Sequence, residues 1–128
     1  MHKVVIHTEL APQAIGKYSQ AIRTGNTVFI SGQLGIVPGT AELVPGFSEQ
    51  THRALCNLDE ICKAAGGNLG SIVRLGVFLT DISYFSEFND IMGQYFSTPY
   101  PARVVIQVSG LPRGGLIETD AIMVIADE

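Results

Sequence analysis

Charged residues are scarce in this sequence. Asp, Glu, Lys and Arg together make up 16% of the 128 residues, whereas about 25% is usual for soluble domains. A small domain has a large surface for its volume, so this shortage indicates that part of the surface is covered in a homo-oligomer. The eight basic residues form no run and the net charge is −4, which argues against a nucleic-acid-binding surface.

Long apolar stretches are also missing. No run approaches the ~18 apolar residues that a membrane-spanning helix needs. The N-terminal segment MHKVVIHTEL has neither the apolar core nor the small-residue cleavage site of a signal peptide. We therefore expect no membrane partner and no secretion signal. The two cysteines, Cys56 and Cys62, fall on different sides of a predicted helix and cannot pair. Free thiols suit a reducing compartment, so we expect a cytoplasmic protein.

Motifs for metals and organic cofactors are absent as well. The sequence contains no HExxH or CxxC motif, and its histidines, His2, His7 and His52, stand apart. The glycine clusters GGNLG and PRGG lack the Lys-Ser/Thr of a phosphate-binding loop and the strand–helix setting of a dinucleotide site. No GxSxG elbow marks a serine nucleophile. We expect neither a metal nor an organic cofactor.

The patterns that are present predict a single domain over residues 1–128, since no linker or repeat divides the chain. The first half predicts an edge strand, a two-stranded hairpin that turns at Gly25-Asn26, and a Gly- and Pro-rich loop. In residue numbers these are 3–7, 20–23 with 27–31, and 32–46. A helix is expected to follow Ser48 as its N-cap and to end at Gly66-Gly67.

The second half predicts a strand, a helix and a C-terminal hairpin. The strand at 72–80 has one apolar face and one mixed face. Its apolar face comprises Val73, Leu75, Val77 and Leu79. The helix runs from Ser83 or Tyr84 to Phe96, and the prolines after it prevent its continuation. Strands at 103–109 and 117–126 are expected to pair with each other. The order of elements predicts an α+β fold, with two helices packed on one face of a mixed sheet.

Three polar residues occupy strand positions where apolar residues are usual. Arg103 opens one strand, and Glu118 lies near the start of the last one. Asp120 shares the face of Glu118, so either carboxylate is a candidate for function. Within a hairpin, Arg103 and Glu118 would not be direct cross-strand partners, although they could face each other across a subunit boundary. Taken alone, each is equally well explained as a surface residue.

Several longer motifs resemble the Rid/YjgF family of enamine/imine deaminases. They are GKYSQA (16–21), FISGQLG (29–35), VFLTDISYFSEFN (77–89) and YPARVVIQVSGLPRGGLIETDAI (100–122). They cover nearly the whole chain in the order found in that family. The combination of SGQ near the start with PAR, LP and IE near the end is more specific to the family than any single motif. The resemblance implies a chorismate-mutase-like (bacillus-type) fold and a homotrimer with sites between subunits. It also implies hydrolysis of 2-imino or 2-enamino acids, such as iminobutanoate and iminopropanoate, to 2-oxo acids and ammonia, without a cofactor.

Carried over residue by residue, the resemblance implies a set of site residues in this chain. Arg103, Glu118 and Tyr18 would be catalytic. The substrate site would be lined by Arg103 together with Ser31, Gly32, Asn89 and Val105. Of these, Gly32 and Val105 would contribute backbone groups. The chemistry is consistent with that set, because a guanidinium matches a flat carboxylate in two hydrogen bonds. A carboxylate such as Glu118 can deprotonate a water for attack on the imine carbon.

The sequence departs from the family pattern in four places. Lys17 stands where many members have proline, Met92 where tyrosine is frequent, and Val105 where cysteine is frequent. The loop at 97–100 is also short. These departures concern the rim of the site, so they bear on substrate range.

Two alternative functions stay open. One is a non-catalytic trimer that binds or senses a small carboxylate, because a fold alone does not decide function. The retention of Glu118 beside Arg103 favours catalysis. The other is a ribonuclease or translation inhibitor, which the acidic pI of about 5.3 and the lack of tryptophan disfavour.

Overall fold

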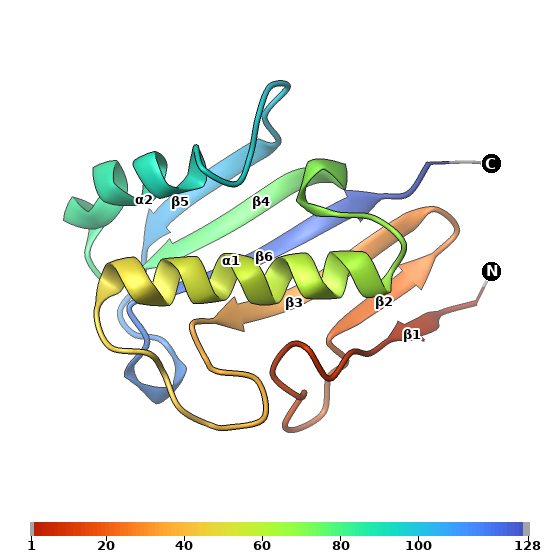
Figure 1. Ribbon diagram of the computed structural model, residues 1–128, viewed down its shortest axis with the longest axis horizontal. Helices are drawn as coiled ribbons and strands as arrows, with labels where there is room; N and C mark the ends of the chain where they lie inside the picture. The colour runs from red at the N-terminus through yellow and green to blue at the C-terminus, as the bar shows by residue number, and fades with distance from the viewer. Residues whose placement is uncertain (1, 127–128) are drawn as a thin grey trace.

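One six-stranded sheet, with two α-helices against one of its faces, organises the chain (Figure 1). The computed structural model describes residues 2–126. The strands are β1 (Val4–Ile6), β2 (Ala21–Thr24), β3 (Thr27–Leu34), β4 (Ile72–Leu79), β5 (Ala102–Gln107) and β6 (Ile117–Val124). The helices are α1 (Phe47–Ala64) and α2 (Phe85–Met92). Short 3-10 turns, η1 (Leu69–Ser71), η2 (Ile82–Tyr84) and η3 (Pro112–Gly114), precede β4, α2 and β6.

The order of strands is β1-β2-β3-β6-β4-β5, which confirms β1 as an edge strand. The β2–β3 hairpin is also confirmed: Thr24 pairs with Thr27, and Gly25 at the turn has a φ of 61°. Since β3 and β4 are both antiparallel to β6, they run parallel to each other, and α1 connects them. The sheet is therefore mixed, as expected.

The predicted C-terminal hairpin is wrong. β5 pairs with β4 in parallel, and β6 lies on the other side of β4, between β4 and β3. The cause is the connection after β5, which contains η3 and is long enough to carry the chain across the end of β4. β6 then supplies antiparallel partners to β3 and β4 together.

A bulge in β4 corrects its predicted apolar face. The pairing with β6 shifts between Ile72 and Arg74, so that Val73 is the extra residue. An extra residue reverses the alternation of side chains on its N-terminal side. Ile72 is consequently buried, whereas Val73 is 48% exposed. The positions after the bulge, Leu75, Val77 and Leu79, are fully buried as predicted.

The strand β3 extends to Leu34, so the loop predicted to start at residue 32 is partly wrong. A register shift against β6 between Ile30 and Gln33 absorbs Ser31 and Gly32, and pairing resumes at Gln33 and Leu34. Gln33 is 5% exposed and Leu34 is 9% exposed. Burial of Gln33 and Leu34 extends the strand past Gly32, although a glycine lies on each side of this pair.

The start of α1 differs from the expectation, and its end agrees with it. Gly46, with a φ of 87°, is the N-cap, and no side chain caps the helix. Phe47 already lies inside the helix and is buried, so burial of this ring sets the start ahead of Ser48. At the other end, Gly67 N donates to Cys62 O at 2.9 Å and Gly66 N donates to Lys63 O at 3.1 Å. This pattern is a Schellman motif, which requires the positive φ of Gly66.

The helix α2 is shorter than predicted, because it ends at Met92 rather than Phe96. The 3-10 turn η2 precedes it, and the Asp81 carboxylate caps that turn by accepting from Ser83 N at 2.9 Å. Phe88 is fully buried, and Phe96, beyond the helix, is still 6% exposed only. The buried side of α2 therefore continues into the turn that follows the helix.

The hydrophobic core lies between the helices and one face of the sheet, and the opposite face has no covering layer (Figure 1). Large apolar side chains on the uncovered side are partly exposed. They include Phe29 at 47%, Val73 at 48% and Ile106 at 43%. Between residues 2 and 126, no helix is both long enough and apolar enough to span a membrane.

Candidate functional site

The structure places Arg103 and Glu118 on opposite faces of the sheet. Arg103 pairs with Leu75, which is fully buried against the helices. Glu118 pairs with Phe78, which has the opposite side-chain direction. Their strands are separated by β4, so their backbones are also roughly 10 Å apart across the sheet, at about 4.8 Å per strand. A single small ligand cannot reach both within one chain.

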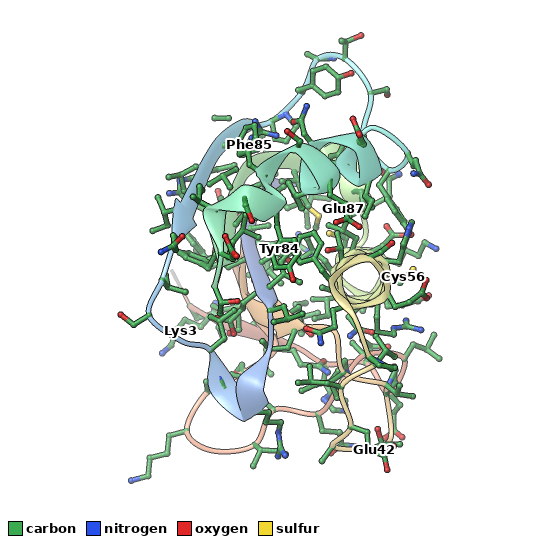
Figure 2. All side chains as sticks on the ribbon, turned by 90° about the vertical axis from the view of Figure 1, so that its left-hand side faces the viewer. Lys3, Glu42, Cys56, Tyr84, Phe85 and Glu87 are labelled. Carbon is green, nitrogen blue, oxygen red and sulfur yellow. The ribbon has the colours of Figure 1, made fainter. Side chains whose placement is uncertain are left out.

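The first group of residues gathers around Arg103, at the start of β5 beneath α2. Arg103 Nη1 donates to Asn89 Oδ1 at 2.7 Å and lies 3.4 Å from Met92 Sδ. Its guanidinium carbon also lies 5.3 Å from the centroid of the Phe85 ring. Figure 2 shows Phe85 on the part of α2 nearest to β5. These contacts fix the guanidinium plane through a hydrogen bond and a cation–π interaction.

A cavity of about 460 Å³ opens beside Arg103. Its lining comprises Asn89, Met92, Gly93, Tyr100, Pro101 and Arg103. Only one terminal nitrogen of Arg103 has a partner among the described residues. The other N–H donors of the guanidinium are free to bind a carboxylate, and a planar fork does so with two parallel hydrogen bonds.

Val105 joins this group through its backbone. Val108 N donates to Leu79 O of β4 at 2.8 Å. Backbone groups alternate in direction along a strand, so the N–H and C=O of Val105 point away from β4. Because β5 is the edge strand, they face the open edge of the sheet beside Arg103.

The second group surrounds Glu118, on the uncovered side of the sheet. A cavity of about 940 Å³ is lined by Glu118, Tyr18, Ser31 and Gly32, together with residues of three loops. The carboxylate lies directly over Gly32, where a Cβ atom would come within 2.7 Å of Glu118 Oε2. Gly32 therefore gives the carboxylate its place at the floor of the cavity.

Burial raises the pKa of the Glu118 carboxyl, and the negative charge of Asp120 raises it further. Asp120 follows at i+2 on the same face and is accommodated over Gly76, as Glu118 is over Gly32. Among the described residues, buried Asp120 Oδ1 has no hydrogen-bond partner. Two carboxyls thus share one face, and a carboxyl in a cavity whose pKa is raised by burial and by a like charge is a candidate for proton transfer.

Tyr18 and Ser31 bring hydroxyls to the same cavity. Tyr18 is 51% exposed, and its Oη accepts a long hydrogen bond of 3.4 Å from Ile15 N. Ser31 Oγ donates to Ser19 O at 2.6 Å. The hydrogen of Ser31 is thereby committed, so this hydroxyl is left as an acceptor toward a ligand.

The sequence-predicted site residues thus form two groups. Tyr18, Ser31, Gly32 and Glu118 line one cavity. Asn89 and Arg103 line another, and Val105 lies two residues along β5 from Arg103. Arg113 lines the Glu118 cavity and was not predicted from the sequence. The signal available was its position in PRGG, directly before Gly114 and Gly115.

No group of three or more His, Cys, Asp or Glu side chains in the described part of the chain is arranged to hold a metal ion.

Known proteins resemble the chain over nearly its whole length. A 2-iminobutanoate/2-iminopropanoate deaminase of Bos taurus is 48% identical over 121 residues, which are 94% of this chain and 88% of the relative. A RutC family protein of Pyrococcus abyssi is 46% identical over 95% of this chain and 97% of its own length.

The fold is likewise shared with solved structures. The crystal structure of RidA from the Antarctic bacterium Psychrobacter sp. PAMC 21119 superposes with a TM-score of 0.93 at 48% identity, covering 95% of this chain and 99% of that one. The family model described as Endoribonuclease L-PSP matches residues 8–125. The order of motifs, the mixed six-stranded sheet and these matches agree, and the chain belongs to the Rid/YjgF family.

Proposed function

We propose that this protein is a 2-iminobutanoate/2-iminopropanoate-type deaminase, which hydrolyses reactive 2-imino or 2-enamino acids to 2-oxo acids and ammonia. Curated relatives that carry this name are 38–48% identical over most of the chain. The observation that carries the proposal is the half-buried Glu118 carboxyl, which lies over Gly32 in an open cavity with the hydroxyls of Tyr18 and Ser31. That arrangement is a base beside a space for a small molecule and a water.

The proposal includes a homotrimer with a chorismate-mutase-like fold and active sites between subunits. Arg103 and Glu118 lie on opposite faces of one sheet, so one substrate can touch both only if they come from different copies. The uncovered sheet face, with Phe29 and Ile106 partly exposed, supports close contact between copies. The low content of charged residues supports it too, because exposed single-domain surfaces are usually richer in charge.

The substrate carboxylate binds first, to the free donors of Arg103. Asn89 holds one nitrogen of the guanidinium, so the remaining N–H groups are already oriented when the carboxylate arrives. Backbone groups of Val105 at the open edge of β5 lie beside it. Fixing the carboxylate also fixes the adjacent imine carbon, and such positioning accelerates the attack of a bound water.

Hydrolysis then needs one base and a water. The Glu118 carboxylate accepts a proton from water as the water oxygen bonds to the imine carbon. The protonated Glu118 returns that proton to the nitrogen. As the C–N bond breaks, the hydroxyl oxygen of the intermediate forms the C=O bond and gives its proton to Glu118, which passes it to the departing ammonia. A protonated imine is already electrophilic, so the proposed reaction uses no cofactor. Tyr18 and Ser31 orient the water or the amino group through their hydroxyl oxygens.

The two free cysteines support our placement of the enzyme in the reducing cytoplasm. The substrate is a small imino or enamino acid, and we propose no nucleic-acid or membrane partner.

The direct test is an imine-decay assay. An amino-acid oxidase generates the imine from alanine or 2-aminobutyrate, and the loss of the imine is followed with and without this protein. We expect wild type to accelerate the decay of the imine over the rate in buffer. Glu118→Gln should give no acceleration. Equal decay rates for wild type, Glu118→Gln and buffer would refute the deaminase.

Mixing two inactive variants tests the intersubunit site. Arg103→Ala and Glu118→Gln chains are co-expressed, so that trimers contain both. A site between copies regains an intact Arg103 and Glu118 in about a quarter of interfaces if chains mix at random. Activity of the mixture well above that of either variant is expected. If the mixture stays as inactive as the separate variants, while mass spectrometry confirms mixed trimers, both residues act from one chain.

The family description Endoribonuclease L-PSP makes RNA cleavage the second candidate. The net charge of −4 and the scattered basic residues give a poor surface for phosphates. We expect no cleavage of a single-stranded RNA by wild-type protein that is active on imines.

A further inference from the structure

The cavity around Glu118 contains a second charged residue, Arg113. Among the described side chains that line this cavity, only Glu118 and Arg113 carry a charge. They come from different elements: Arg113 from the turn η3, and Glu118 from β6 directly after it. The deamination chemistry proposed above uses Glu118 and leaves Arg113 without a role.

Arg113 has no partner within the described part of the chain. The ion pair found there is Lys63–Asp59, at 3.2 Å between Lys63 Nζ and Asp59 Oδ2. Arg113 makes no hydrogen bond or ring contact with any described residue. A guanidinium with five donors and no acceptor is therefore available at the cavity wall.

The backbone of Arg113 adopts a conformation that arginine rarely occupies. Its φ of 59° and ψ of 17° lie in the left-handed region, and it is the only non-glycine residue of the described chain with a positive φ. Glycine would adopt this conformation without strain, and glycines follow directly at 114 and 115. A strained position that keeps a long charged side chain at a cavity indicates a role for that side chain.

The cavity is also larger than the smallest substrates require. Its volume of about 940 Å³ is at the upper end of the range of ~300–1,000 Å³ for ligand pockets. In one chain, before a second copy contributes Arg103, an imino acid with a methyl or ethyl side chain would fill a small part of it. Apolar residues, among them Ile15 and Ile36, also line the cavity, so it can accept a substrate with a longer side chain.

We propose that Arg113 binds a second carboxylate at the end of the substrate side chain, so that the enzyme prefers dicarboxylic 2-imino acids such as 2-iminoglutarate. This assignment rests on the deaminase function proposed above. Arg103 of one copy would hold the carboxylate next to the imine, and Arg113, beside Glu118, would hold the distal one. Two guanidiniums and one general base then match the charges of the substrate.

The reaction itself is unchanged by the second carboxylate. Water adds its oxygen to the imine carbon, and its two protons end on the nitrogen of the protonated imine. The C–N bond breaks, which yields 2-oxoglutarate and an ammonium ion. No oxidant or other co-reactant takes part.

Binding of the oxo acid products tests the assignment without catalysis. Calorimetry compares 2-oxoglutarate with pyruvate on wild type, Arg113→Gln, Arg113→Gly and Arg113→Lys. Wild type should bind 2-oxoglutarate at least about tenfold more tightly than pyruvate, because a charged hydrogen-bonded contact changes affinity by about ten- to hundredfold. The Gln and Gly variants should lose that preference and keep pyruvate affinity within about twofold. The Lys variant should retain part of it.

Two controls separate this result from general effects. Arg113→Gly suits the positive φ, so loss of the preference in that variant cannot come from a misfolded turn. Lys3→Gln removes one positive charge from an exposed residue outside the cavity, and it should behave as wild type. A wild type that binds pyruvate as tightly as 2-oxoglutarate, or that binds neither at millimolar concentration, overturns the assignment. An equal loss of affinity for 2-oxoglutarate and for pyruvate in Arg113→Gln would also overturn the assignment.

Kinetics distinguish failure of this inference from failure of the proposed function. The ratio of kcat/KM for the imine of glutamate to that for the imine of alanine should fall about tenfold or more in Arg113→Gln. If wild type hydrolyses neither imine, the deaminase proposal fails, and the oxo acid preference still decides whether Arg113 is a carboxylate-binding residue.

Discussion

At the scale of single residues, Arg103 is the side chain whose removal should be most informative. Truncation to Arg103→Ala removes a bidentate carboxylate contact, at a cost of roughly 2–5 kcal/mol. Since 1.36 kcal/mol is a factor of ten, kcat/KM for imine hydrolysis should fall by about two to three orders of magnitude or more. Arg103→Lys should restore only a small part, because an ammonium lacks the planar fork. Arg103 is exposed, so the melting temperature should change little. Full activity of Arg103→Lys would rule out the carboxylate clamp.

Glu118 should set the acidic limb of the pH–rate profile. Burial first and Asp120 second raise its pKa, which means that both favour the protonated form. The proposed base must be ionised, so kcat/KM should rise with pH through a pKa above the ordinary value for glutamate. Asp120→Asn removes the like charge and should move this limb to lower pH. The limb should stay above the ordinary value, because burial is the larger cause. A limb that ignores Asp120→Asn would point to another titrating group.

The two cysteines should react at very different rates. Burial raises the pKa of the Cys62 thiol to about 12, and its side chain is fully buried. Cys56 is only half-buried. Because thiolate is the reactive form, a disulfide reagent at pH 8 should titrate one thiol per chain quickly and the second only on unfolding. Cys56→Ser should abolish the fast phase, and Cys62→Ser should preserve it.

At the scale of elements, α1 is joined to the turn after α2 by a polar contact on the helix side of the molecule. His52 Nδ1 and Tyr95 Oη are 2.6 Å apart, and their rings are tilted at 54°. Cys56 Sγ lies 4.0 Å from the same oxygen, and Figure 2 shows Cys56 on α1. The contact fixes the segment after Met92, where the chain no longer forms a helix. The segment leads to Tyr100, at the rim of the Arg103 cavity.

This contact has a measurable signature in the tyrosine titration. Desolvation first, and the nearby Cys56 second, raise the pKa of Tyr95 to about 12. Of the four tyrosines, one should therefore titrate about two pH units later than free tyrosine, as followed by absorbance at 295 nm. The folded state holds this proton more tightly than the unfolded state, so the stabilisation is complete below pH 10 and is lost as the pH rises toward 12. Tyr95→Phe should remove the late step.

Local sequence patterns predicted most helices, strands and turns well. They predicted poorly which strands lie next to each other in the sheet. The Gly66-Gly67 stop and the Gly25-Asn26 turn are determined by residues close in sequence, and the structure confirms them. The pairing of β6 is different, because β6 satisfies β3 and β4 together. Nothing within residues 103–126 reveals that preference. The side-chain direction of Val73 was predicted wrongly for a related reason. The bulge at Val73 is a feature of the pairing between β4 and β6.

At the scale of the whole molecule, the proposed trimer is itself a test. Light scattering should give three times the chain mass of 13.7 kDa, without dependence on concentration in the micromolar range. Phe29→Lys would put a charge among the partly exposed apolar side chains of the open sheet face and should reduce the assembly to smaller species. Imine hydrolysis should be lost with the assembly. A monomeric wild type that is active on imines would contradict the intersubunit site.

Sequence reasoning could propose candidate site residues, and it could not say which of them lie together. Arg103 and Glu118 were found as polar residues in apolar strands, and the family resemblance supplied Tyr18, Ser31, Asn89 and the two backbone positions. Their division into two groups depends on which face of the sheet each strand position occupies, and on the place of β4 between β5 and β6. Arg113 was missed because a turn with PRGG is explained by its glycines alone.

The glycines beneath the two carboxyls of β6 also shape the relief of the open face. Gly32 on β3 and Gly76 on β4 lie on either side of β6, and each leaves room for a carboxyl to fold down against the backbone. The carboxyls of Glu118 and Asp120 are consequently recessed, while the side chains of Phe29, Val73 and Ile106 are partly exposed. A second copy that packs on this face would meet mainly these apolar side chains, while Glu118 and Asp120 stay in hollows of the surface.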